Sequence, residues 1–561
     1  MEYVLFVIVM VGVVSILMIN GYYNYKKSEK NFIKSLYETY GKLPCKEYKQ
    51  EQFDNISHYF LKHKNDFCVD DITWNDLNMD EVFKRMNYTH SAAGEEYLYH
   101  TLRTPITDKQ ELHKREKIID FFRKEEDVRV SFQVIFAKLG TIGKFSIYDY
   151  LDYLDGLGMR SNLPHYVTFI LLIAAIIVMF INMPIGLLTF VCVLIYNNIS
   201  YFKIKSEIDP YITSFSYIFR LLDGVDQVRK QKVSVLEDER EILKECSSSM
   251  TSFKTGSFLL MSTGRMSGSG NPLDMLVDFL RMTLHLDLIK FNQMLSEVRK
   301  HTDQIDQMLT IMGKIETLIV IGEYRESLEL YCLPEFTDNV MIYGKELYHP
   351  LLTDPVKNSI ETKKSVLITG SNASGKSTFL KTVALNAILA QTIHTVLAES
   401  YTASMFRICS SMALRDDVQG GDSYYMVEIK ALKRILDILK RDDLPLLCFV
   451  DEVLRGTNTV ERIAASAQIL RSMASKNCIC FAATHDIELT HLLEDSYNNY
   501  HFSEEIADND IFFSYKIQEG RATTRNAIKL LGIMGYDDII IQKAENMAGE
   551  FLKVGRWHGL D

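Results

Sequence analysis

A glycine-rich segment beginning at Gly370 has the residue types and spacing of a phosphate-binding loop. The segment GSNASGKST follows a β-branched run, Ser365–Gly370, that predicts a buried strand, and precedes the helix-compatible run Thr378–Gln391. Glycines let successive backbone amides point at phosphate, while Lys376 can reach the β- and γ-phosphates and the Ser377 hydroxyl can ligate Mg²⁺. The expected nucleotide-binding residues are Gly370, Ser371, Asn372, Ala373, Ser374, Gly375, Lys376, Ser377 and Thr378.

Two further predicted strands end in polar pairs. The run Leu446–Asp451 ends in Asp451 followed by Glu452, where the first carboxylate can hold Mg²⁺ and the second can position an attacking water. The run Asn477–Ala483 is followed by Thr484 and His485, which can contact a γ-phosphate. The alternatives are an acidic turn that caps a strand and a histidine of the core. Because these side chains follow predicted strand ends, we favour a catalytic role for them. The expected catalytic residues are Glu452, His485 and Lys376, and the expected metal ligands are Ser377 and Asp451.

The segments around these residues resemble those of the MutS mismatch-repair family, in the same order along the chain. The matching segments are GSNASGKST, a signature run at Asp416–Glu428, DEVLRGTNTVE at Asp451–Glu461, ATHDIELT at Ala483–Thr490, a helical tail at Asn526–Ala544, and the approach residues His349, Pro350 and Asn358. Upstream, Leu77–Leu112 resembles the start of the family's α-helical core and lever region. The resemblance therefore reaches beyond the phosphate loop.

The resemblance implies an ABC-type α/β P-loop ATPase domain at the C-terminus, preceded by an all-α lever domain. It implies ATP and Mg²⁺ as cofactors and a homodimer through the ATPase domain, with two composite sites. In such a dimer Ser423 of one subunit caps the γ-phosphate bound by the other, although a serine here could equally be a helix N-cap. Glu452 would orient or deprotonate water, and His485 would sense the γ-phosphate.

Two concentrated apolar blocks predict membrane-spanning helices. Val4–Asn20 carries no charge and is followed by lysines, as expected of an uncleaved anchor; a cleaved signal peptide would carry its positive charge before the apolar run. Tyr166–Phe202 contains two apolar runs broken at Asn182, Met183 and Pro184, which predicts a hairpin with both ends on the basic side. The alternative is a buried helical pair. We expect three spans in the plasma membrane and a cytoplasmic ATPase domain.

The predicted organisation is an anchor at 1–24, a linker at 25–75, a helical core at 76–335 interrupted by the hairpin at about 166–202, and an ATPase domain at 336–561. Within the core, Ser247–Asn271 is rich in Ser, Gly and Met and predicts a loop. The interval before the core is too short for the family's mismatch-reading and connector domains. Where the family places an aromatic residue on the adenine, this chain offers Val356, which puts recognition of the base in question.

Composition separates the possible functions. The net charge is −11, with 73 acidic against 62 basic residues, which does not favour a surface that wraps duplex DNA. Nine cysteines without a CxxC pair support neither a zinc ribbon nor a thioredoxin-type redox site and indicate reduced thiols. The first hypothesis is a membrane-anchored ATPase coupled to mismatched or branched DNA; the second is an ATP-gated scaffold acting on a protein partner. An ABC transporter motor is weaker, because no LSGGQ signature occurs. A one-sided stripe of Lys and Arg along 201–330 would favour DNA.

Overall fold

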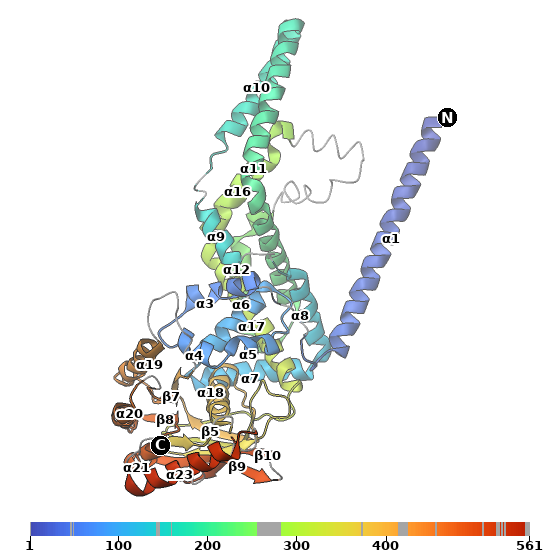
Figure 1. Ribbon diagram of the computed structural model, residues 1–561. Coiled ribbons are helices and arrows are strands. Elements are labelled where there is room, and N and C mark those ends of the chain that lie inside the picture. The colour runs from blue at the N-terminus through green and yellow to red at the C-terminus, as the bar shows by residue number, and fades with distance from the viewer. Residues whose placement is uncertain are drawn as a thin grey trace. The chain divides into compact units, whose positions relative to one another are not determined.

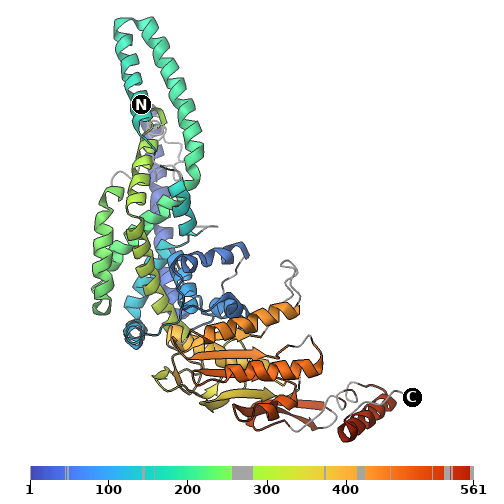
Figure 2. The same ribbon diagram turned by 90° about the vertical axis from the view of Figure 1, so that its left-hand side faces the viewer.

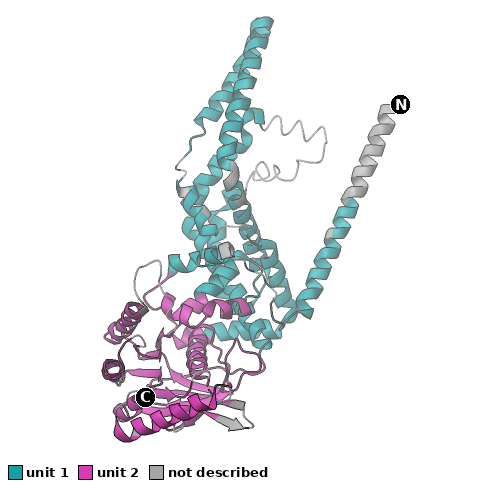
Figure 3. Cartoon of the chain, in the orientation of Figure 1, with its two compact units in different colours: residues 1–63, 86–100, 114–327 teal, residues 64–85, 101–113, 328–561 magenta. Residues whose placement is uncertain are grey.

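The structure of the chain, a computed structural model, forms two units (Figures 1 and 3). Unit 1 comprises residues 1–63, 86–100 and 114–327, and unit 2 comprises residues 64–85, 101–113 and 328–561. The structure describes residues 2–44, 46, 48, 50–141, 146–156, 158, 160–254, 282–371, 374–412, 424–441, 443–454, 457–507, 510–522, 528, 531 and 535–555.

Unit 1 is helical, and its central element is α17 (Thr302–Glu326). Nearly every residue of α17 from Ile305 to Arg325 is buried, as expected of a helix surrounded by others. Arg325 makes a two-pronged ion pair with Glu116, at 2.6 and 2.9 Å. The other helices of this unit include α1 (Glu2–Glu38), α2 (Gln50–Ile56), α3 (His58–His63), α8 (Glu126–Leu139), α9 (Ile147–Gly156), α12 (Glu237–Ser249), α13 (Thr251–Lys254) and α16 (Leu286–Lys300). Helices α6 (Ala92–Arg103) and α7 (Lys109–Lys124) belong to it in part, because residues 101–113 are assigned to unit 2.

The predicted hairpin is formed by α10 (Leu163–Ile181) and α11 (Met183–Lys230), which run side by side (Figure 2). The break between them is Asn182 alone, whose side chain accepts a hydrogen bond from the Ile185 amide at 3.4 Å. The sequence prediction of a three-residue break was therefore too long. Pro184 belongs to the first turn of α11, where a missing N–H breaks no helical bond.

Both helices of the hairpin are long and apolar enough to cross a membrane, over Leu163–Ile181 and Met183–Ile208. Their apolar side chains are largely uncovered within the structure; Phe180 is 85% exposed and Ile181 is 81% exposed. Near the turn, Gly186 leaves room for the backbone of α10, because a methyl group there would lie 2.1 Å from the Met179 Cα. Helix α1 contains the predicted N-terminal anchor, but the side chains of residues 1–18 lie outside those described, so that span stays a prediction.

The predicted loop at Ser247–Asn271 is helical where the structure describes it. Helix α12 continues to Ser249, and α13 covers Thr251–Lys254. The reason is Phe253, which is fully buried and lies 4.6 Å from the Phe219 ring, centroid to centroid. One buried aromatic outweighs the local Ser-rich composition. Residues 255–271 lie outside the described residues.

Unit 2 contains two sheets and the helices that cover them. The larger sheet has the order β10-β9-β4-β8-β7-β6, parallel except for the β9–β10 pair. The smaller sheet has the order β1-β5-β2-β3. Helix α18 (Lys376–Ile393) is buried on nearly all sides and contacts strands of both sheets. The strands are β1 (Glu335–Thr337), β2 (Ile342–Leu347), β3 (Asn358–Thr362), β4 (Ser365–Thr369), β5 (Ser400–Ser404), β6 (Arg407–Ser411), β7 (Leu446–Asp451), β8 (Cys478–Ala483), β9 (Tyr497–Ala507) and β10 (Asp510–Glu519).

Two short stretches that the sequence analysis places before the ATPase domain belong to unit 2. Helix α4 (Asp71–Asp76) is attached to β6, because the buried Asp76 carboxylate accepts hydrogen bonds from the Ser410 hydroxyl at 2.7 Å and the Met412 amide at 2.9 Å. The Ile106 amide donates to the Gln391 carbonyl at the end of α18. Residues 76–85 and 101–113 therefore group with the sheets and not with the helical unit. The partners in these hydrogen bonds lie more than 280 positions later in the chain, so no local sequence pattern could have predicted this grouping.

Glu96 of α6 is a buried carboxyl group that makes the stability of unit 1 depend on pH. It is 5% exposed, and burial raises its pKa to about 8, while hydrogen bonds from the Ser146 hydroxyl at 2.8 Å and from the Tyr59 backbone oppose that change. The folded chain therefore keeps this proton at pH values where the unfolded chain, with an ordinary glutamate pKa of about 4.3, has released it. Stability from this group is complete below the unfolded pKa and is lost as the pH rises through the folded pKa.

We expect Glu96→Gln to flatten the dependence of unfolding on pH. Between pH 5 and pH 8 the parent should lose stability with a slope of up to about 1.4 kcal/mol per pH unit from this group, and the variant should not. Chemical unfolding at several pH values, with helical circular dichroism as the signal, measures the slope. Glu126→Gln, an exposed position in the first turn of α8 (Glu126–Leu139), should keep the parental slope. Parallel curves for parent and Glu96→Gln would contradict the assignment.

Candidate functional site

The predicted phosphate loop joins β4 to α18. Strand β4 is buried along its whole length and ends at Thr369, and α18 begins at Lys376. Gly370 and Gly375 adopt φ values of 147° and 105°, which residues with a side chain rarely adopt. A methyl group at Gly370 would lie 2.9 Å from the Ser374 Oγ. The backbone path therefore needs glycine at both ends of the loop. Asn372 and Ala373 lie outside the described residues.

Lys376 lies inside the loop with its ammonium group on the loop carbonyls. Its Nζ donates to the Gly370 carbonyl at 2.8 Å and to the Ser371 carbonyl at 2.7 Å. The residue is 5% exposed, whereas Ser377 and Thr378 on the first turn of α18 are exposed. The Lys376 ammonium group is thus held beside the N-terminus of α18, where a phosphate loop binds its phosphate.

The strand ends bring the acidic pair and the histidine to this loop. Strand β8 lies between β4 and β7, with Ala483 opposite both Ile368 and Asp451. The Glu452 amide donates to the Ala483 carbonyl at 2.9 Å. The Thr484 amide donates to the Ile368 carbonyl at 3.0 Å. Because the three strands are parallel and in register, their carboxyl ends, with the side chains that follow, meet at one edge of the sheet.

The side chains of Glu452 and His485 contact each other across that edge. The His485 Nε2 lies 2.7 Å from the Glu452 Oε1, and the Glu452 side chain is 12% exposed. The backbone at Glu452 and Leu454 has positive φ values of 55° and 58°. Such strained non-glycine residues concentrate at functional sites. The Leu454 amide also donates to the buried Glu428 of α19 (Tyr424–Leu439), which fixes the turn after β7.

Asp451 has the free oxygen that a metal site requires. Its Oδ1 is buried and accepts no hydrogen bond from any described residue. The Ser374 Oγ, across the phosphate loop, is buried in the same way within the described part of the chain. Buried polar atoms normally have partners, so an oxygen without one marks a place for an ion or water. Carboxylate and hydroxyl oxygens are the ligands that Mg²⁺ prefers, so the donor set fits this cation.

A second ion pair that the sequence did not reveal holds the loop carrying His485. Arg462 of α20 (Thr459–Met473) binds Asp486 through two bonds, Nε to Oδ2 at 3.0 Å and Nη2 to Oδ1 at 2.6 Å. Asp486 lies between His485 and α21 (Ile487–Leu492). Two parallel bonds from a planar guanidinium fix the direction of a carboxylate. No spacing rule pairs residues 24 positions apart, so only the fold identifies this support.

A cavity of about 260 Å³ opens beside the phosphate loop, lined by residues that include His349, Val356, Asn358, Phe502 and Tyr515. Val356 therefore lines a cavity next to the loop, and its place beside an adenine stays a prediction. Burial lowers the pKa of His349 to about 4, which keeps its ring neutral.

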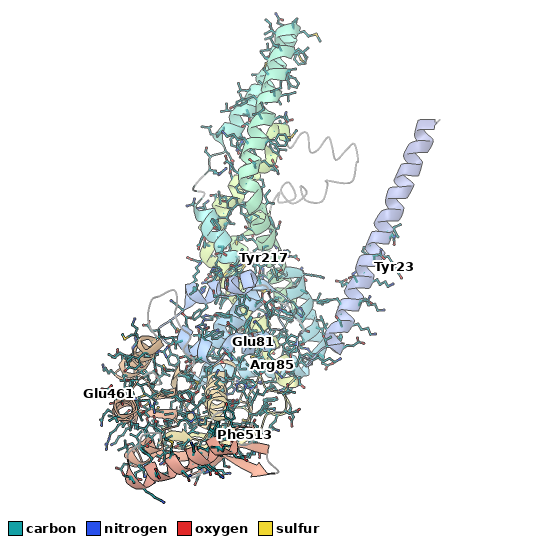
Figure 4. The ribbon with its side chains drawn as sticks, viewed as in Figure 1. Tyr23, Glu81, Arg85, Tyr217, Glu461 and Phe513 are labelled. Carbon is teal, nitrogen blue, oxygen red and sulfur yellow. The ribbon has the colours of Figure 1, made fainter. Side chains whose placement is uncertain are left out.

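Tyr515, which the sequence analysis missed, presents its ring to this cavity from a bulge in β10. Its φ of 51° falls where the β9–β10 register shifts. Asn358 fixes the bulge by donating to the Tyr515 carbonyl and by accepting from the Ile517 amide, both at 2.9 Å. The neighbouring ring of Phe513, labelled in Figure 4, lies 5.9 Å from that of Tyr515. A stacking surface can therefore come from β10 although position 356 lacks an aromatic.

Parts of the predicted site lie outside the described residues. Ser423 is among them, as is most of the signature run before α19. The predicted helical tail is described in its second half, where α23 covers Asp538–Val554. Several apolar side chains of α23 are uncovered; Ile539 is 63% exposed and Ile540 is 52% exposed.

Comparison with known proteins finds similarity to MutS proteins. Residues 366–552 match the family described as MutS domain V. The DNA mismatch repair protein MutS of Thermotoga maritima is 31% identical over 265 residues, which cover 45% of this chain and 33% of that protein. MutS protein homolog 4 of Homo sapiens is 31% identical over 267 residues, covering 44% of this chain and 28% of that protein. The MutS of Clostridium kluyveri is 26% identical over 362 residues, covering 62% and 39%.

The chain thus spans about a third of the length of the curated relatives it matches. The match to domain V begins in β4 and ends in α23, so it contains the phosphate loop, the acidic pair and the histidine described above. On this agreement between sequence and site, residues 366–552 of the chain belong to the family of MutS domain V.

Proposed function

We propose that this chain is a membrane-anchored, MutS-like ATPase that binds and hydrolyses ATP with Mg²⁺ in a dimer. The observation that carries the proposal is the Glu452–His485 pair at 2.7 Å, beside an Asp451 oxygen with no hydrogen-bond partner among the described residues. All three lie at the strand edge that adjoins the phosphate loop. A base, a cation ligand and a phosphate-binding lysine at one edge suit phosphoryl transfer to water better than binding alone.

Each residue has a separate task in this reaction. Lys376 and the loop amides neutralise phosphate charge, and Ser377 and Asp451 would hold Mg²⁺, which supplies further charge neutralisation when bound. Glu452 accepts a proton from the attacking water or orients it, and His485 holds the Glu452 carboxylate while it reports on the γ-phosphate. Catalysis then consists mainly of positioning and charge stabilisation.

The cavity beside the loop would receive the nucleobase, with Tyr515 as the stacking residue. We expect Tyr515→Ala to weaken ATP binding about tenfold, since stacking on an aromatic contributes about 1–3 kcal/mol per base. The value of kcat should change little, because the contact is the same in the ground state and the transition state. Steady-state hydrolysis over a range of ATP concentrations separates the two constants. Tyr343→Ala, on β2 of the other sheet, is the control; equal KM values for both variants would reject the stacking role.

Dimerisation would complete the site. The resemblance assigns Ser423 to the partner's γ-phosphate, and the exposed apolar residues of α23 offer a surface for a second copy. Closure of such a dimer on ATP would drive motion of the helical region. The α10–α11 hairpin would place that region at the membrane, with the ATPase domain in the cytoplasm.

Two of the relatives named above are DNA mismatch repair proteins, and we propose coupling to mismatched or branched DNA as the first candidate role. A second candidate, action on a protein partner, is favoured by the charges of unit 1. Four of the described lysines and arginines between 201 and 330 are paired with carboxylates: Lys205 with Asp287, Arg229 with Asp226, Arg240 with Glu237, and Lys314 with Glu239. Paired cations neutralise few phosphates.

DNA binding by the full chain in nanodiscs tests the two roles. The Glu452→Gln variant would hold ATP while homoduplex, mismatched and branched DNA are compared at low and physiological salt. ATP-dependent binding that survives physiological salt supports the DNA role. Binding that disappears with salt, and is equal for all three DNAs, leaves the protein-partner role.

A further inference from the structure

A cavity of about 390 Å³ lies in unit 1 at the base of the hairpin, between the segment that precedes α10 and the outer face of α16. Three cationic side chains line it, Arg160, Lys290 and Arg299, against one carboxylate, Glu297. Amide and hydroxyl groups complete the lining, including Asn162, Asn292 and Ser296. The cavity is therefore rich in hydrogen-bond donors, and cations outnumber carboxylates in its lining, although Arg160 also pairs with Glu207 at 3.2 Å.

Lys290 is the unusual member of this set. It is 8% exposed, and among the described residues no acceptor lies within hydrogen-bond or ion-pair distance of its ammonium group. Burial lowers its pKa, and the field of Glu297 opposes that change only in part. Glu297 itself faces Lys300 at 3.7 Å and His301 at 3.9 Å. The Lys290 ammonium group thus lines the cavity without a partner among the described residues, and an anion bound there could pair with it.

The cavity is held firmly against the hairpin. Asn292 of α16 donates to the Asn162 side chain at 2.9 Å, directly before α10. Lys205 of α11 pairs with the fully buried Asp287 of α16 at 3.0 Å, and the Tyr201 hydroxyl donates to the same carboxylate at 2.7 Å. The start of α16 is thus fixed to both legs of the hairpin, next to which Figure 1 shows it. The cations line this cavity at the end of the apolar segment where positive charge is expected to face the cytoplasm.

We propose that this cavity, which Lys290 lines, binds the phosphate headgroup of an anionic phospholipid of the cytoplasmic leaflet. Basic pockets beside membrane helices on that side are suited to such headgroups. A lipid is favoured over free phosphate because apolar side chains continue from the cavity along α10, where Leu163 is 67% exposed and Tyr166 is 45% exposed. The headgroup would occupy the cavity while the acyl chains lie along the hairpin.

This inference relies on the hairpin of the proposed function, but its test does not. Full-length protein in dodecyl maltoside is titrated with dihexanoylphosphatidylglycerol, dihexanoylphosphatidylcholine or inorganic phosphate, each lipid below its critical micelle concentration. We expect the anionic lipid to bind at least tenfold more tightly than the other two. Lys290→Gln should weaken that binding at least tenfold, since a charge-assisted bond to phosphate is lost. Lys244→Gln, in a second charged cavity of unit 1, should change it less than twofold.

Each other outcome overturns the proposal. Equal affinity for the two lipids would mean that the cavity does not distinguish headgroups by charge. Equal affinity for inorganic phosphate and the anionic lipid would mean that the cavity binds a soluble anion. Unchanged affinity in Lys290→Gln would remove the residue from the site; if that variant fails to fold, Arg299→Gln takes its place. Resistance to alkaline extraction from membranes is measured separately, and its failure would remove the membrane part of the proposed function without affecting the titration.

Discussion

The Glu452→Gln variant is expected to lose ATP hydrolysis by about 100- to 1000-fold while it still binds ATP. The structure gives Glu452 the position of a base: its backbone is held at φ 55° by the turn after β7, and its carboxylate lies against His485. Glutamine keeps the size of the side chain but cannot take a proton. Loss of a positioned general base lowers kcat by about 10²–10⁴-fold.

Phosphate release by the full chain and equilibrium binding of a fluorescent ATP analogue measure the two properties separately. Glu461→Gln is the matched control, because Glu461 lies exposed at the start of α20, within the same family-like segment. The control should hydrolyse ATP within about twofold of the parent. A Glu452→Gln rate within threefold of the parent would place the base elsewhere, and loss of both binding and hydrolysis would give Glu452 a structural role.

Much of this site follows from local sequence because its residues lie directly after strands. The buried runs that became β4, β7 and β8 have strong β-branched and apolar character, and parallel strands bring their carboxyl ends to one edge. Once these three parallel strands are predicted, Lys376, Asp451 and His485 are also predicted to lie near one another at that edge of the sheet. The left-handed backbone at Gly370 and Gly375 is likewise visible as glycine in the sequence.

The rest depends on contacts between residues far apart in the chain. Tyr515 reaches the nucleotide cavity because Asn358, 157 positions earlier, holds a bulge in β10. Arg462 meets Asp486 because α20 and α21 pack together. Lys290 belongs to no motif, and only the fold shows that it lines a cavity with Arg160 and Arg299. Ser247–Lys254 shows the opposite error, since a loop-like composition is overridden by the buried Phe253.

The Lys376→Met variant should lose ATP binding itself, which distinguishes it from Glu452→Gln. Lys376 is the cation held inside the phosphate loop, with its Nζ 2.8 and 2.7 Å from two loop carbonyls. Hydrogen bonds to charged groups contribute about 1.5–3 kcal/mol each. Loss of about 3 kcal/mol from the contacts with phosphate lowers affinity by about 100-fold. Methionine matches the length of the lysine stem and fills the same buried space.

Equilibrium ATP binding and thermal unfolding should be measured together, because Lys376 also donates hydrogen bonds to two carbonyls of the loop and its loss can destabilise the loop. Lys363→Met, in the exposed turn between β3 and β4, serves as the control and should bind ATP within about twofold of the parent. Added ATP should raise the unfolding temperature of the parent and of Lys363→Met but not that of Lys376→Met, because only a ligand that binds the folded state stabilises it. A folded Lys376→Met that retains ATP affinity would show that the loop amides alone hold the phosphates.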